Sequence, residues 1–260
     1  MGSLRSVLQA AAFAPVILAA SLAAGSPPAM AQEPMPHQKW SFERLFGGYD
    51  IAAAQRGFQI YSNVCSNCHS MKLLHYRDLS GIGLNAAQIK AVAAAVTVPD
   101  GVDDQGNPKE GPAAPADQFK SPFANDAAAK AANNGAVPPD LSLMVNAREG
   151  GPNYIYGILT GFVPAPKGFK VGEGLYYNKM FPGHQIHMPP PLQDGTVDYT
   201  DGTSNKLPQE AHDVITFLAW AANPELVERK QVGVRVILFL VFMTGLTYAV
   251  KRKVWSDVHH

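Results

Sequence analysis

The sequence predicts a mainly α-helical fold with long irregular loops and one C-terminal transmembrane helix. Apolar residues recur at helical spacing in several segments, whereas no segment shows a convincing strand-type alternation. Among the 21 prolines and 23 glycines, many fall in long aperiodic stretches such as 97–126 and 161–208, which predicts much irregular chain. An apolar run close to the C-terminus is long enough to cross a bilayer.

Two or three helices can be placed before that apolar run. The first follows Asp50, a good N-cap residue, and its apolar face extends as far as Tyr61. The second begins after Leu207, has a proline in its first turn and ends at Pro224. A shorter helix is expected in GGPNYIYGILTG, from Pro152 onward.

The N-terminus has the features of a secretory signal peptide. A lone Arg5 precedes the apolar stretch 7–24, and Ala29-Met30-Ala31 supplies a small-x-small cleavage site. A first membrane span is the alternative, but the apolar stretch is short and Pro15 interrupts it. We therefore expect residues 1–31 to be cleaved off as a signal peptide.

The apolar run Val232–Val250 predicts a membrane anchor. At ~1.5 Å per residue it spans about 28 Å, close to the ~30 Å thickness of the hydrocarbon layer. Arg235 lies in its first turn, where the side chain can snorkel to the headgroups, and Lys251–Lys253 mark the cytoplasmic flank. A buried core helix is the alternative, but such a helix has no need of three cations directly after an apolar run.

Together the two ends of the chain define a topology. Residues 32–228 are predicted to form a periplasmic domain, 229–250 a single anchor helix in the cytoplasmic (inner) membrane, and 251–260 a short cytoplasmic tail. The whole chain is neutral, but residues 32–228 contain 14 basic and 20 acidic residues. This negative charge favours a basic partner and argues against binding to nucleic acid.

Both cysteines of the chain occur in the segment Cys65-Ser-Asn-Cys68-His69, for which we considered three chemistries. A thioredoxin-type dithiol needs a βαβ context, which the flanking sequence lacks. A zinc clip needs a second pair of Cys or His ligands at short spacing, and no such pair is apparent. The third chemistry is c-type haem attachment, in which both thiols form thioethers and the adjacent histidine binds the iron. The exported context favours this third interpretation, with one covalently bound haem c.

An electron-transfer haem needs a second axial ligand, and methionine is the ligand that raises the redox potential. Methionines in the signal, in the membrane, near the new N-terminus or beside His69 are unsuitable, which leaves Met144, Met180 and Met188. Met188 precedes three prolines, which fix φ and stiffen the segment that would carry the thioether. On spacing alone, His184 and His187 remain rival ligands.

Several stretches resemble, in order, the cytochrome c1 family: RGFQIYSNVCSNCHSMKLLHYRDL, AANNGAVPPDLSLMVNAREGGPNYIYGILTG, GLYYNKMFPGHQIHMPPPL and DVITFLAWAANPE, followed by the C-terminal anchor. The resemblance covers nearly the whole mature chain. The CxxCH motif is common to c-type cytochromes in general, whereas PPDLS and the YYNKMFPG and MPPP segments are far more particular. The resemblance implies a class I cytochrome c-like haem domain.

The resemblance also implies roles for individual residues. Cys65 and Cys68 would carry the thioethers, and His69 and Met188 would be the axial ligands of the haem iron. His187 stands where the family often has a small residue, which leaves a His/Met ambiguity at the sixth position. The residues implied as partners of the haem propionates are Arg148, Tyr154 and Asn133.

The function that the resemblance implies is electron transfer within the proton-translocating quinol:cytochrome c oxidoreductase, the cytochrome bc1 complex. The chain would take an electron from the Rieske iron–sulfur protein and pass it to a soluble c-type cytochrome, with cytochrome b and membrane lipid as further partners. No bond-making chemistry, and hence no catalytic residue, is expected in this chain. The alternatives are another membrane-anchored monohaem c cytochrome that donates to a terminal oxidase, and a c-haem peroxidase or sensor.

Acidic residues are frequent between positions 100 and 126. Asp100, Asp103 and Asp104 are the candidate docking residues for the basic face of a soluble cytochrome. A merely solvated loop explains the same pattern equally well.

Overall fold

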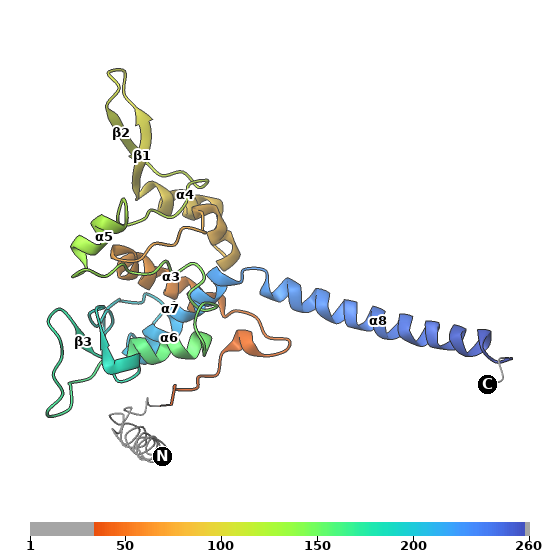
Figure 1. Cartoon of the computed structure of the whole chain (residues 1–260). Helices are drawn as coiled ribbons and strands as arrows, with labels where there is room; N and C mark the ends of the chain where they lie inside the picture. Colours follow the sequence, from red (N-terminus) through yellow and green to blue (C-terminus); the bar gives the residue numbers. More distant parts are fainter. Residues whose placement is uncertain (1–33, 258–260) are drawn as a thin grey trace, which may run out of the picture. The chain divides into compact units, whose positions relative to one another are not determined.

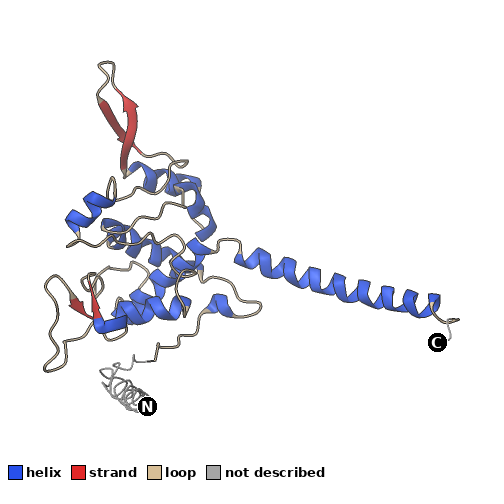
Figure 2. Cartoon of the chain, viewed as in Figure 1, coloured by secondary structure: helices blue, strands red, loops and turns tan. Residues whose placement is uncertain are grey.

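The computed structural model describes residues 34–257, which belong to one compact unit of mainly helical chain (Figure 1). The predicted signal peptide lies outside the described residues. Within the described part, strands are few and short (Figure 2). The predicted mainly α class with long irregular loops is therefore confirmed.

The elements follow one another in a simple order. The α-helices are α3 (Ile51–Asn63), α4 (Ala86–Ala94), α5 (Asp126–Ala132), α6 (Gly151–Thr160), α7 (Leu207–Ala222) and α8 (Leu226–Val254). The 3-10 helices are η2 (Ser41–Glu43), η3 (Cys65–Asn67), η4 (Tyr76–Ile82) and η5 (Pro182–His184). The strands are β1 (Thr97–Val102), β2 (Pro108–Pro112), β3 (Tyr176–Tyr177) and β4 (Gln185–Ile186).

Helix α3 carries the chain to the cysteine motif. The Asp50 side chain caps it by accepting a hydrogen bond from the backbone N–H of Ala53 at 3.0 Å. The helix crosses α7 at Gly57, where an added Cβ would overlap the carbonyl oxygen of Asp213 and lie 2.7 Å from the Cβ of Phe217. Glycine is therefore required where these two helices cross.

Helix α7 lies in the hydrophobic core. Its side chains from Glu210 to Ala221 are nearly all buried, because it packs against both α3 and α6. The Trp40 ring stacks on Phe42 and on His212, with ring centroids 5.6 and 4.8 Å apart, which attaches the segment before α3 to α7. The largest fully buried apolar side chains of the described part are Phe217, Ile60, Met71, Leu79, Ile82 and Ile215.

The two aperiodic segments contain antiparallel hairpins that the sequence did not predict, β1 with β2 and β3 with β4. Most residues of β1 and β2 are exposed, so no alternation of polar and apolar residues is needed. The other two strands are only two residues long each. Helices α4 and α5 were also not predicted, because their alanine-rich sequences contain few large apolar residues.

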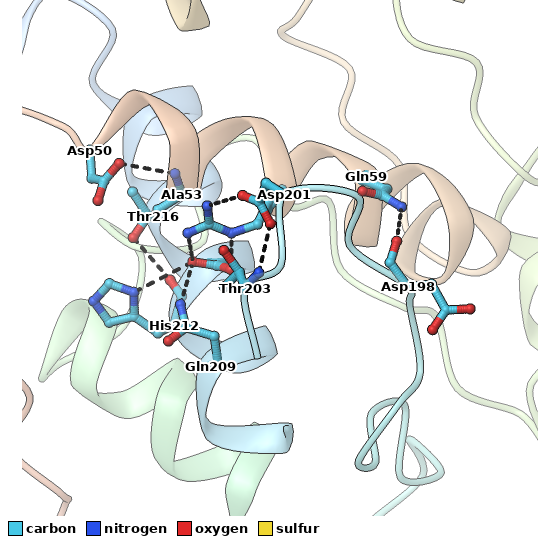
Figure 3. A network of polar contacts seen from close by, with 11 residues as sticks. Asp50, Ala53, Gln59, Asp198, Asp201, Thr203, Gln209, His212 and Thr216 are labelled. Atoms are coloured by element: carbon cyan, nitrogen blue, oxygen red, sulfur yellow. Dashed lines mark hydrogen bonds and ion pairs between the residues drawn. The ribbon is translucent and has the colours of Figure 1, made fainter. Parts of the chain in front are cut away.

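A polar network joins α3, α7 and the loop around Asp201 (Figure 3). The Arg56 guanidinium donates to the two carboxylate oxygens of Asp213 at 2.7 and 3.1 Å, and to Asp201 at 2.9 Å. The Gln209 amide also donates to Asp213, at 2.9 Å. The Asp213 side chain is fully buried, so its charge depends on these donors for stabilisation.

Helix α8 is long and apolar enough to cross a membrane, and none of its residues is buried within the described part of the chain. At ~1.5 Å per residue its 29 residues extend over about 43 Å, so both ends reach beyond a ~30 Å hydrocarbon layer. The helix is a candidate membrane span that includes the whole predicted anchor.

Candidate haem site

The cysteine motif forms a tight turn at the C-terminal end of α3. The backbone N–H groups of Cys68 and His69 both donate to the carbonyl oxygen of Cys65, at 3.1 and 2.8 Å. The side chains of Ser66 and Asn67 donate back to carbonyl oxygens of α3, at 2.7 and 3.1 Å. Ser66 and Asn67 therefore fix the spacing of the cysteines. Cys65, Cys68 and His69 are all half-buried.

Both cysteines are free in the structure. Burial raises the pKa of the Cys65 thiol to about 12, and the proximity of Cys68 acts in the same direction. A thioredoxin-type dithiol needs the opposite, a lowered thiol pKa. Among the described residues, no group of three or more His, Cys, Asp and Glu side chains is arranged to hold a metal ion.

The His69 ring is oriented by one hydrogen bond. Its Nδ1 lies 2.7 Å from the carbonyl oxygen of Pro139, and because a carbonyl can only accept, Nδ1 carries the proton. Burial lowers the pKa of His69, although the bond to Pro139 opposes this shift. The imidazole is therefore neutral at neutral pH, and its Nε2 lone pair is available to a metal.

The carbonyl that orients this histidine belongs to a loop organised by Asp140. The Asp140 carboxylate accepts hydrogen bonds from Ser70 Oγ at 2.8 Å and from the backbone N–H groups of Lys72 and Ser142, both at 2.9 Å. Burial acts to raise the pKa of Asp140, but these hydrogen bonds outweigh it and leave the pKa below its ordinary value. One carboxylate thus connects the two segments that make the histidine site.

The three candidate methionines differ in burial. Met144 and Met180 are buried, with exposed fractions of 9% and 3%. Met188 is half-buried, while its neighbour His187 is exposed. His184 is buried in η5, where its ring stacks on a tyrosine of β3. Of the three methionines, Met188 alone combines partial exposure with a proline-stiffened segment.

The hairpin that leads to Met188 is attached to α6 by Asn178. This side chain is fully buried; its Nδ2 donates to the carbonyl oxygen of Ile158 at 2.8 Å, and its Oδ1 accepts from the backbone N–H of Met180 at 3.0 Å. The approach is close, because a Cβ added at Gly161 would lie 2.6 Å from Asn178 Oδ1. The starting point of the methionine segment is therefore fixed relative to α6.

The three predicted propionate partners form no hydrogen bond with the cysteine motif within the described part of the chain. Arg148 is exposed and donates to the carbonyl oxygen of Ala147 at 3.0 Å. Asn133 is the C-cap of α5 and donates to the carbonyl oxygen of Ala129 at 2.8 Å. Tyr154 is half-buried in the first turn of α6 and packs against the core. Their roles therefore stay predictions.

The three candidate docking aspartates belong to the β1–β2 hairpin. Asp100 forms an exposed ion pair with Lys109 on the opposite strand, at 3.3 Å. Asp103 accepts hydrogen bonds from the side chain and backbone of Asn107, at 3.0 and 2.8 Å, and these bonds lower the pKa of its carboxyl group. Asp104 is exposed. The segment is a folded hairpin, and part of its negative charge is used within it.

The fold and the histidine site together define a class of protein. Two cysteines fixed three positions apart, followed by a neutral imidazole with an available Nε2, fit covalent attachment and axial ligation of haem iron. Met188, a half-buried methionine in a proline-stiffened segment, is the candidate for the second ligand. The chain is thus a c-type haem protein with a candidate membrane span.

Known proteins narrow this class further. The model of the cytochrome C1 family matches residues 40–258. The chain is 48% identical over 239 residues to cytochrome c1 of Rhodospirillum rubrum, and the aligned region covers 86% of this chain and 88% of that protein. It is 41% identical over 270 residues to cytochrome c1 of Blastochloris viridis, covering 94% and 95%. Against a mitochondrial cytochrome c1 heme protein of Arabidopsis thaliana the identity is 44% over 222 residues, covering 85% and 72%.

The chain therefore belongs to the cytochrome c1 family. Proteins of this family carry haem c with its iron, and they are membrane-anchored electron-transfer subunits of the cytochrome bc1 complex. The sequence resemblance is confirmed, and so is the haem cofactor.

Sequence reasoning missed the positioning roles of Pro139 and Asp140. The proline pair before Asp140 is a turn signal, and it could have indicated Asp140 as the organiser of a loop. Nothing local relates this loop to His69, because the two hydrogen-bonded residues are 70 positions apart. A backbone carbonyl as a histidine partner also leaves no trace in the residue type.

Proposed function

We propose that this chain takes one electron at a time from the Rieske iron–sulfur protein and passes it to a soluble c-type cytochrome. The observation that supports this most strongly is the histidine site, in which Pro139 orients a neutral His69 directly after two attachment thiols. Cytochrome b is the expected partner in the membrane. The chain performs no bond-making chemistry, and proton translocation belongs to the whole quinol–cytochrome c reductase.

In this proposal, Cys65 and Cys68 would attach one haem by thioether bonds, and His69 and Met188 would hold its iron. The haem, when bound, supplies a one-electron couple. With two side chains as ligands, the iron would have no position for small molecules such as CO. The propionates are assigned to Arg148, Tyr154 and Asn133, since a carboxylate without a partner is costly to bury.

We further propose that residues 32–228 are periplasmic and that α8 crosses the inner membrane with its C-terminus in the cytoplasm. The basic cluster in the last turn of α8, Lys251–Lys253, follows the positive-inside rule. Protease added to intact spheroplasts should remove the haem domain and leave a C-terminal epitope protected. The opposite cleavage pattern would reverse the orientation.

Quinol-driven reduction, measured in a membrane complex purified through this chain, tests the proposed function. A b-type cytochrome should co-purify, quinol should reduce the c haem, and a soluble basic cytochrome should reoxidise it. If no b-type cytochrome co-purifies and quinol leaves the c haem oxidised, the chain is a different anchored cytochrome, such as a donor to an oxidase. CO binding by the reduced haem would instead indicate a peroxidase or a sensor.

A further inference from the structure

Two adjacent large apolar side chains, Leu45 and Phe46, are exposed in the loop that connects η2 to α3. Their exposed fractions are 72% and 81%, although Trp40 and Phe42 just before them are buried. The loop, residues 44–48, takes no part in the histidine site. Two adjacent apolar side chains that are exposed to this extent indicate an interaction surface.

This loop is attached to the start of α8 by a single lysine, Lys230. The ammonium group of Lys230 donates to the carbonyl oxygens of Phe42 at 2.7 Å and Gly47 at 3.1 Å, and also to that of Arg44. These three hydrogen bonds from one ammonium group fix the position of the loop along the axis of α8.

The loop backbone also packs directly on the first turn of α8. A Cβ added at Gly48 would lie 3.1 Å from Val227 Cγ2, so the two chains touch at this point. A cleft of about 390 Å³ lies between these segments. Its lining includes the side chains of Phe42, Tyr49, Leu226 and Lys230.

The attachment places the loop at the level of the lipid headgroups. Lys230 precedes the apolar run by only two residues, which is about 3 Å along a helix axis. The headgroup layer on each side of the hydrocarbon core is about 5–7 Å thick. The loop that Lys230 binds therefore lies within this layer if the apolar run spans the hydrocarbon.

Charges of both signs lie near the loop. Arg44 and Arg229 are exposed, as are Glu43 and Glu228, and Arg235 lies within the apolar run itself. Cations at this depth pair with lipid phosphates, while aromatic and aliphatic side chains reach the boundary of the acyl chains. Two side chains alone are too small for the core of a protein–protein interface, which buries about 800 Å² on each partner.

We propose that Leu45 and Phe46 form a second membrane contact, inserting at the boundary between headgroups and acyl chains beside the start of α8. The contact rests on the proposed membrane span, and it goes beyond that span because it fixes the haem domain at a second point. A single helix permits rotation about its own axis, whereas two contacts with the bilayer restrict the orientation of the domain toward its redox partners.

A depth measurement in the reconstituted complex tests the proposal. Glu43→Cys, next to the pair, is labelled with a nitroxide in the full complex in liposomes, and its relaxation by apolar O2 and by a water-soluble nickel chelate is compared. The haem cysteines, as thioethers, do not react with the label. We expect the nitroxide to be more accessible to O2 and less accessible to nickel than one attached at Val102→Cys, an exposed position of β1.

A matched variant isolates the two apolar side chains. Glu43→Cys combined with Leu45→Ser and Phe46→Ser should move the nitroxide toward water, raising its nickel accessibility several-fold. Both serine positions are exposed, so covalent haem and an unchanged absorption spectrum serve as evidence of folding. Leu73→Ser, which changes another exposed leucine (61%), should leave the nitroxide depth unchanged.

Two results at position 43 would overturn the proposal. A label at position 43 that is as accessible to nickel as the one at position 102 would leave the pair in water. A label shielded from both relaxing agents would show that a protein subunit covers the loop. A further label at Phe242→Cys, in the middle of α8, tests the membrane span independently of the loop contact. If it is inside lipid while position 43 is not, only the second contact fails; if it is in water, the proposed span fails as well.

Discussion

Asp140 shows how much of the histidine site depends on one side chain. Its carboxylate accepts hydrogen bonds from Ser70, Lys72 and Ser142, and the neighbouring Pro139 carbonyl orients His69. Asp140→Ala removes all three acceptor contacts. We expect the free energy of unfolding, measured by denaturant titration, to fall by about 2 kcal/mol, with an altered haem absorption spectrum because the ring is less well oriented.

The conservative variant is the control for this experiment. Asp140→Asn retains one carbonyl oxygen, which can still accept from Ser70 and Lys72, so the loss of stability should be smaller than for alanine. Equal stability and unchanged spectra for wild type and both variants would remove Asp140 from the support of the site.

At the residue scale, sequence reasoning was limited by distance along the chain. Cys65, Cys68 and His69 were found because their spacing is itself the signature of the chemistry. From the residues alone, Met188 was one candidate beside Met144 and Met180, and the family resemblance selected it. Met188 is half-buried and the other two are buried, but its role as a ligand stays a prediction. The hydrogen bond from His69 to a main-chain carbonyl could not be predicted, because every residue type carries such a carbonyl.

Among the secondary-structure elements, the α3–α7 crossing is the most demanding contact. Gly57→Ala would place a methyl group onto the Asp213 carbonyl oxygen and against Phe217, so the helices must separate. Such overpacking costs about 1–3 kcal/mol of the free energy of unfolding, and thermal unfolding should detect it. Ala52→Ser, on the exposed side of the same helix, should stay within about 0.5 kcal/mol of wild type. A wild-type melting curve for Gly57→Ala would contradict the close crossing.

The polar network between α3 and α7 predicts a pH dependence. Burial acts to raise the pKa of Asp213, but the His212 ring 3.8 Å away and the hydrogen bonds from Arg56 and Gln209 outweigh it and leave the pKa below its ordinary value. The stability that this carboxylate contributes is therefore present above the pKa of an unfolded aspartate, and it is lost as the pH falls through the lower folded pKa. Asp213→Asn should reduce stability at neutral pH and flatten its loss toward acid pH.

The matched control is Asp198→Asn, which changes an exposed aspartate of the adjoining loop (Figure 3). Denaturant unfolding at a series of pH values should show that the stability of this variant changes with pH as that of wild type does. Glu210, whose pKa is raised by burial, contributes in the opposite sense, but it is present in both variants. An unchanged acid slope in Asp213→Asn would mean that the folded and unfolded pKa values are equal.

The helices that bury a face of large apolar residues could be predicted from the sequence, and the exposed hairpin could not. Helices α3, α6 and α7 each bury one face or more, so their apolar residues recur at helical spacing and their ends carry clear capping or proline signals. The β1–β2 hairpin lies outside the core, and pairing between its own strands maintains it. Its sequence therefore shows no pattern of burial that could have predicted it.

For the molecule as a whole, the acidic hairpin predicts an effect of salt on electron transfer to a basic acceptor. Asp100→Asn combined with Asp104→Asn leaves the turn-forming Asp103 intact, and it should slow reduction of the soluble cytochrome several-fold at low salt. Near physiological ionic strength, where the Debye length is about 8 Å, the rates should converge. Glu173→Gln changes an exposed acid outside the hairpin and serves as the control. Equal rates at all ionic strengths would make the hairpin merely solvated.

The candidate functional site of the whole molecule draws on segments that are distant in the sequence. The attachment turn follows α3, the loop that orients His69 precedes α6, and the methionine segment follows the hairpin attached to α6 by Asn178. The sequence predicted the three segments through their residues and through family resemblance. It could not predict the hydrogen bonds from His69 to Pro139 and from Asn178 to α6, because these depend on tertiary packing.

A redox titration of the haem in the purified complex tests whether His69 and Met188 share one iron. Wild type should show a high midpoint potential. Met188→Leu should retain covalent haem but lose a large part of the ~0.8 V range over which axial ligands tune haem potentials. His187→Ala, at the exposed neighbouring position, should titrate as wild type does. An unchanged midpoint in Met188→Leu, or a large drop in His187→Ala, would contradict the axial pair.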